Sequence, residues 1–110
     1  MRFVAFIGHG PNWIPGKSNL EQGEPMRAHF AKMDQRFGEG SLLIGGPFRS
    51  ADGGLAVLNV GSEAEAREIM DADPGVQAGV LSYELKEHIA YFDVITSTRT
   101  PASEVSRAWL

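Results

Sequence analysis

The sequence predicts an α+β fold of the ferredoxin-like βαββαβ type, in which two helices cover one face of an antiparallel sheet. Two observations carry this prediction. Short apolar runs rich in β-forming residues alternate with segments of helical character, and clusters of turn residues separate them. The chain of 110 residues, with 43% hydrophobic and 22% charged side chains, has the size and composition of one soluble globular domain. We expect a folded domain over residues 1–95 and a partly ordered C-terminal extension over 96–110.

An N-terminal strand followed by an irregular loop opens the predicted fold. The apolar run Phe3–Ile7 ends at a cluster of turn residues and is typical of a strand. The next segment, up to about Gly23, is rich in proline and glycine but holds Trp13 and Ile14. We therefore expect a loop that has no regular structure and still packs on the domain.

The first helix is predicted from Pro25 to about Phe37. Apolar side chains recur there at steps of four, three and four, which is the spacing of one helical face. The side chains that this spacing directs toward the core are Met26, Phe30, Met33 and Phe37. The helix is expected to end at Gly38-Glu39-Gly40, because glycine adopts the left-handed conformation common at helix ends.

A hairpin and a second helix follow. The apolar runs Ser41–Gly46 and Leu55–Val60 are joined by a loop with an Asp-Gly-Gly turn signal, which predicts two antiparallel strands. Ser62 and Glu65 then have the spacing of a capping box, which predicts the start of a helix that ends near Asp71. The side chains predicted to face inward are Ala66, Ile69 and Met70.

The last strand of the sheet is predicted over Val80–His88, where side chains of two kinds alternate after an Asp73-Pro74-Gly75 turn. Residues Ile89–Ile95 either continue this strand or form a fifth one. The tail beyond them is rich in serine, threonine and arginine.

Three strands are apolar on both faces, namely Phe3–Ile7, Leu42–Ile44 and Leu55–Leu58. Two helices cover only one face of a sheet of this kind, so the second face needs another cover. The economical cover is the sheet of a second copy of the chain. We therefore expect a homodimer formed through the sheet face, which makes a dimeric α+β barrel.

Charge and cysteine content exclude several classes of function. The net charge of −4, without a cluster of lysine and arginine, argues against nucleic acid or an anionic membrane surface as a partner. The absence of cysteine excludes disulfides, a thiolate nucleophile and a cysteine-based zinc site. The apolar run at the N-terminus is too short for a signal peptide or a membrane span, which favours a cytoplasmic location.

Three histidines, His9, His29 and His88, are the candidates for a general base besides the carboxylates. On the predicted first helix, His29 lies about 60° to the side of the apolar face, at its rim. By itself this position also fits an ordinary helix histidine with a structural hydrogen bond or with solvent contact. A metal site shared by His9 and His29 has no close ligand spacing to support it.

Several segments together resemble the YCII-related family. They are Arg27-Ala28-His29, the stretch from Glu39-Gly40 to Gly45-Gly46-Pro47-Phe48, and Asp71–Val80. The resemblance covers roughly residues 1 to 90, and the family's ferredoxin-like dimeric barrel agrees with the fold predicted from the strands. The chain departs from the usual family pattern in its first loop, in Lys86-Glu87-His88-Ile89 and in its C-terminal extension.

The resemblance implies a catalytic pair, His29 and Asp73, in a cleft between the helices and the sheet. An aspartate that accepts a hydrogen bond from one imidazole nitrogen leaves the other nitrogen to abstract or donate a proton. Such a pair needs neither a metal nor a cofactor. Alternatively, Asp73 bonds only to the backbone of its own turn, and Asp71 is the neighbouring carboxylate that competes for the role.

The expected substrate-binding residues lie in loops around this cleft and are Phe48, Arg49, Ser50, His9 and Trp13. Phe48 is expected to wall an apolar pocket, and Arg49 or Ser50 to meet a polar group of the substrate. The two tryptophans, Trp13 and Trp109, are candidates for a lid over a small aromatic ligand.

The function that the resemblance implies is cofactor-free proton transfer on a small cyclic or phenolic metabolite. The reaction would be an elimination, such as dehydrochlorination, or an isomerisation. An alternative is a dimer that binds a small ligand or regulates without catalysis. A third possibility is a haem-degrading or quinol monooxygenase of related barrel shape, which requires a pocket large enough for its ligand.

Overall fold

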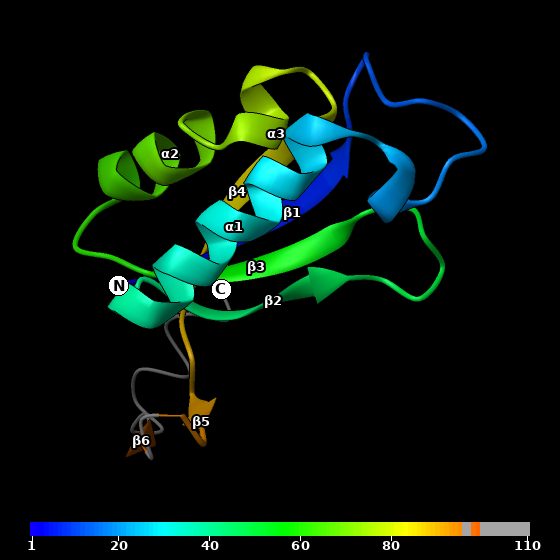
Figure 1. Ribbon diagram of the computed structural model, residues 1–110. Helices are drawn as coiled ribbons and strands as arrows, with labels where there is room; N and C mark the ends of the chain where they lie inside the picture. Colours follow the sequence, from blue (N-terminus) through cyan, green and yellow to red (C-terminus); the bar gives the residue numbers. More distant parts are fainter. Residues whose placement is uncertain (96–97, 100–110) are drawn as a thin grey trace.

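The computed structural model describes residues 1–95 and the backbone of residues 98–99. Its main elements are β1 (Arg2–His9), α1 (Glu24–Glu39), β2 (Leu42–Pro47), β3 (Gly54–Asn59), α2 (Glu63–Asp71), α3 (Pro74–Gln77) and β4 (Leu81–His88). Four antiparallel strands form a sheet in the order β2-β3-β1-β4, and the helices lie on one of its faces (Figure 1). The predicted α+β fold is confirmed, with one short helix, α3, added to it.

The core lies between this sheet and the helices. The central strand β1 contributes Phe3, and its neighbour β3 contributes Leu58, while Met70 comes from α2; all three are fully buried. The side chains of Ala56 and Leu58 on β3 face the helices, and those of 55, 57 and 59 face the other way. No helix within residues 1–95 and 98–99 is both long and apolar enough to cross a membrane.

Helix α1 has the predicted extent but a different buried side. Gly40 ends it with a φ of 86°, as the glycines predicted. The buried residues are Met26 and His29, whereas Phe30 is 38% and Phe37 is 62% exposed. The predicted core positions of Phe30 and Phe37 are therefore wrong, because α1 contacts α3 on its His29 side and leaves a pocket between its two phenylalanines and the sheet.

Helix α2 begins and ends where predicted, and Ala66, Ile69 and Met70 are buried as expected. The Ser62 hydroxyl accepts a hydrogen bond from the Glu65 N–H at 3.2 Å. The Glu65 carboxylate accepts from the Gly61 N–H at 2.8 Å, one residue before the cap. The capping interaction is thus present, with its return bond displaced by one residue from the predicted one.

The predicted Asp73-Pro74-Gly75 turn is the start of a helix. Asp73 is the N-cap of α3, and Pro74 occupies the first helical position. Proline fits there because its fixed φ suits a helix and its missing N–H has no partner in the first turn. The short turn therefore continues as one helical turn, which leads into β4.

The loop between β1 and α1 is packed, as predicted, around a buried glutamine. The Gln22 side chain accepts from the Ile14 N–H at 2.8 Å and donates to the backbone oxygens of Ile14 and Lys17, each at 3.0 Å. A short 3₁₀ turn, η1 (Asn19–Glu21), lies within the loop. Trp13 packs on the domain, but Ile14 stays 47% exposed, so only part of the expected loop packing is present.

After β4 the chain leaves the sheet. Strand β5 (Phe92–Asp93) pairs with β6 (Thr98–Arg99) in a separate two-stranded sheet, so residues 89–95 contain a short fifth strand and do not extend β4 (Figure 1). An ion pair between Arg2 and Asp93, 2.5 Å apart, ties this segment to β1. The expected order of the extension over 96–110, with Trp109, lies outside the described residues apart from the backbone of 98–99.

Tyr83 on β4 gives the fold an expected alkaline sensitivity. Its hydroxyl donates to Asp71 at 2.6 Å, and burial first, then this bond and the Asp71 charge, raise the pKa of Tyr83 above its ordinary 10.0. At a pH below the ordinary pKa, the phenol is protonated in both the folded and the unfolded protein. At a higher pH the unfolded chain loses the phenol proton more readily than the folded one, so the stability of the fold falls as the pH rises. Urea midpoints measured between about pH 9 and 11 should fall less in Tyr83→Phe than in the wild type. Equal slopes would contradict this account.

Candidate active site

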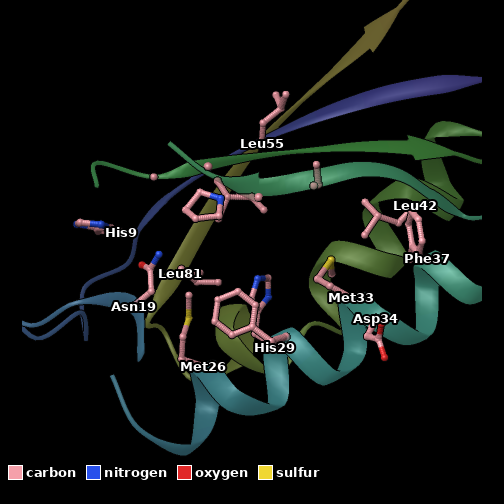
Figure 2. Close-up of a pocket in the computed structure, with 18 of the residues that line it drawn as sticks. His9, Asn19, Met26, His29, Met33, Asp34, Phe37, Leu42, Leu55 and Leu81 are labelled. Carbon is pink, nitrogen blue, oxygen red and sulfur yellow. The ribbon is translucent and has the colours of Figure 1, made fainter. Parts of the chain in front are cut away.

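A pocket of about 410 Å³ separates α1 from the β2 and β3 side of the sheet. Helix α1 lines it with Met26, His29, Phe30, Met33 and Phe37, and Figure 2 shows these side chains facing the strands where they are labelled. The pocket continues to the end of β1, where His9 and Asn19 lie. Its walls are mostly apolar, and few polar groups reach it.

Small residues on the strands make room for this pocket. Gly45 of β2 is paired with Ala56 of β3, which is paired with Ala5 of β1, on the face that the helices cover. A methyl group at Gly45 would lie 3.4 Å from the Leu42 side chain, in ordinary contact and without a clash with the backbone. The glycine therefore leaves space that a larger residue would fill. Glycine inside a strand is a sequence signal of this kind of close approach.

His29 lies at the centre of the site. Its side chain is buried, and Nδ1 is 2.8 Å from one Asp73 carboxylate oxygen and 2.9 Å from the other. The imidazole rises from α1 toward the pocket between Met26 and Met33 (Figure 2). Nε2 has no hydrogen-bond partner among residues 1–95, and it is not sealed in the interior. The free nitrogen of the ring is therefore the one open to the pocket.

Asp73 is completely buried, and its carboxylate bonds both to His29 and to the backbone at the start of α3. Its Oδ2 accepts hydrogen bonds from the N–H groups of Gly75 and Val76 at 3.0 and 3.2 Å. An ionised carboxylate only accepts, so the proton between it and His29 belongs to Nδ1. This arrangement leaves a lone pair on Nε2, which is the form of neutral imidazole that can take a proton. Asp73 thus caps α3 and orients His29 at the same time.

The other candidates are distributed unevenly around the pocket. His9 and Trp13 line it, and their rings are stacked, with centroids 3.7 Å apart and planes 5° from parallel. Phe48, Arg49 and Ser50 lie in the loop between β2 and β3 and are not among the lining residues. The Ser50 hydroxyl donates instead to Asp52 at 2.5 Å.

Two further candidates, Asp71 and His88, lie outside the pocket. Asp71, the alternative to Asp73, is exposed and accepts the hydroxyl of Tyr83. His88 is exposed at the end of β4. Within the described part of the chain, no three His, Asp or Glu side chains are placed to hold a metal ion together.

Sequence reasoning missed the pocket walls. It assigned Phe30 and Phe37 to the core and did not single out Asn19 or Gly45. An apolar face of a helix has the same spacing whether it meets a packed sheet or a cavity, so no local signal separates the two cases. The glycine inside β2 was the available hint.

Comparison with known proteins gives a family and a fold. The YCII-related domain family matches residues 1–89. The uncharacterized protein YjpA of Bacillus subtilis (strain 168) is 38% identical over 64 residues, which are 58% of this chain and 75% of that protein.

A solved structure extends the likeness to the fold. It is 5-chloro-2-hydroxyhydroquinone dehydrochlorinase (TftG) from Burkholderia phenoliruptrix AC1100, in complex with 2,5-dihydroxybenzoquinone. The match has a TM-score of 0.62 at 18% identity and covers 81% of this chain and 94% of that one. At this identity the likeness concerns the fold alone.

Proposed function

Because this chain belongs to the YCII-related family, we propose that it is a small enzyme that transfers protons without a cofactor. His29 is the general acid and base, and Asp73 orients it. The observation that carries the proposal is the buried pair of these two side chains, with Nε2 of the imidazole open to an apolar pocket. Polar groups that are buried, paired and directed into a pocket in this way are typical of acid–base sites.

The reaction follows from the protonation state of the pair. Nε2 takes a proton from a C–H or O–H group of the substrate, and the imidazolium that forms is stabilised by the Asp73 carboxylate. In an isomerisation, the same nitrogen returns the proton at another atom. In an elimination, the electrons of the broken bond form a double bond, and a leaving group such as chloride departs with its electron pair. The low polarity of the buried site strengthens each of these charge interactions.

The pocket indicates the size and type of the substrate. About 410 Å³ lies at the small end of the range for ligand sites, roughly 300–1,000 Å³. Phe30 and Met33 offer an apolar wall opposite the small side chains of the strands. A single ring with a hydroxyl or carbonyl group fits these properties, whereas a haem is large for this space. The dehydrochlorinase of the same fold, with its one-ring ligand, supports this class by analogy.

The test is solvent exchange on a panel of hydroxyquinols, hydroxyquinones and unsaturated lactones. Proton NMR in deuterium oxide should show catalysed exchange or conversion of at least one compound by the wild type. His29→Gln should reduce the rate to that of the buffer, because a glutamine side chain at position 29 has no nitrogen that can take a proton. His88→Gln, which changes an exposed histidine outside the pocket, should retain the rate. Binding of a ring without any exchange or conversion would favour a ligand-binding or regulatory dimer instead.

We further propose that a second copy of the chain covers the open face of the sheet. Val4 and Phe6 of β1, Leu55 and Val57 of β3 and Ile44 of β2 point to this face, away from the helices. Phe6 and Ile44 are 42% and 51% exposed, which leaves an apolar band over three strands. Apolar bands of this kind on small proteins mark interaction surfaces.

A further inference from the structure

His9 has features that a purely structural role does not use. It ends β1 at one end of the pocket, and its ring lies flat against Trp13. Neither ring nitrogen has a hydrogen-bond partner among residues 1–95. The stack therefore holds the ring in one plane while both of its nitrogens remain available.

The chain around the His9–Trp13 stack is hydrogen-bonded to the residues that follow α3, the helix that Asp73 caps. The Gly10 N–H donates to Val80 at 2.9 Å, and the Asn12 N–H donates to Gly79 at 2.8 Å. A methyl group at Gly10 would lie 2.2 Å from the Gly79 oxygen, so only glycine permits this close approach. The chain from His9 to Trp13 is thus hydrogen-bonded to the connection between α3 and β4, which follows the helix that Asp73 caps.

Apart from His29, the polar side chains that face the pocket gather at this end of it. His9 and Asn19 lie there together, and the Asn19 amide also has no hydrogen-bond partner within the described residues (Figure 2). Asp34 is the remaining charged residue of the lining, and Figure 2 shows its carboxylate pointing away from the cavity. His29 is separated from this polar end, formed by His9 and Asn19, by the apolar side chain of Met26.

We propose that His9, held by Trp13, and the neighbouring Asn19 amide bind an oxygen substituent of the ring at the end remote from His29. This inference rests on the proposed function, because it takes the ring to lie with one oxygen at Nε2 of His29. Binding at both ends of the pocket restricts the expected ligands to rings that carry oxygen atoms on two opposite sides. The second oxygen selects and orients the ring, while the first one is near the nitrogen that moves the proton. His9 is a specificity-determining residue in this arrangement.

The test compares two probes, hydroquinone and phenol, which differ only in the second oxygen. Affinities are measured by amide chemical-shift titration of the wild type and of His9→Phe, a variant that keeps a flat ring for the stack. The wild type should bind hydroquinone more tightly than phenol. His9→Phe should weaken hydroquinone binding about tenfold, the effect of one lost hydrogen bond, and leave phenol unchanged. His88→Phe is the matched control and should change neither affinity.

A second variant keeps the test decisive if His9→Phe is poorly folded. Asn19→Ala removes an amide without hydrogen bonds in the described structure and should weaken hydroquinone binding in the same selective way. Equal losses for both probes, or no loss for either, would overturn the role of His9. Failure of both probes to bind the wild type would overturn it too, whatever the exchange assay shows. Selective binding without proton transfer would instead leave this inference standing and refute the proposed catalysis.

Discussion

Asp73→Asn should lower the rate of proton transfer about 10³- to 10⁴-fold by reversing the tautomer of His29. Asparagine caps a helix well, so its oxygen should continue to accept from Gly75 and Val76. The amino group of the asparagine then faces Nδ1 of His29, so two N–H donors are directed at each other and no hydrogen bond forms between them. The imidazole avoids this conflict by moving its proton to Nε2, which removes the lone pair that faces the pocket.

Two measurements check this result. Long-range proton–nitrogen NMR spectra report which ring nitrogen of His29 carries the proton, with or without a substrate. The rate is measured on a compound converted in the exchange assay. Asp71→Asn is the matched control. Asp71 lies two positions before Asp73 and is exposed, and an asparagine oxygen there can still accept the hydrogen bond from the Tyr83 hydroxyl. An Asp73→Asn protein that keeps its proton on Nδ1 and its rate would refute the role of Asp73.

Val57→Lys should convert the proposed dimer into a monomer. Val57 lies on the central part of the open face, and its register partners are Val4 on β1 and Ile44 on β2. A lysine there would carry a charge into the centre of an apolar interface, where it has no partner and loses its hydration. The effect should therefore exceed that of any substitution at the rim of the interface.

Light scattering or sedimentation at micromolar concentration measures the outcome. The wild type should have twice the chain mass of 11.9 kDa, and Val57→Lys should have the mass of one chain. Ala64→Lys adds the same charge on α2, an exposed position in the helical layer, and should leave the mass unchanged. A wild type that is monomeric at these concentrations would refute the second copy on the sheet face.

The pair of His29 and Asp73, for which we propose a catalytic role, shows how far sequence reasoning reached. His29 and Asp73 are 44 positions apart, and no periodicity links them. The family resemblance proposed the pair, and the residue types supplied its chemistry. Reasoning from the residues left two roles open for Asp73, a hydrogen bond to the backbone of its own turn or a hydrogen bond to His29. The structure shows that one oxygen can serve the backbone of α3 while the carboxylate also meets the imidazole, so the two interpretations are compatible.

The sequence by itself determined the order of the elements, their approximate ends and the fold class. These follow from local causes: apolar spacing along Pro25–Phe37, the glycine at position 40 and the serine cap at position 62 act within a few residues. Only the tertiary structure decided which side of α1 is buried and where the pocket lies. The partner of His29 on another helix turns that polar side chain inward, because a buried imidazole requires a hydrogen bond. The phenylalanines then face a cavity that exists because the small residues Gly45 and Ala56 are paired on neighbouring strands opposite the helix.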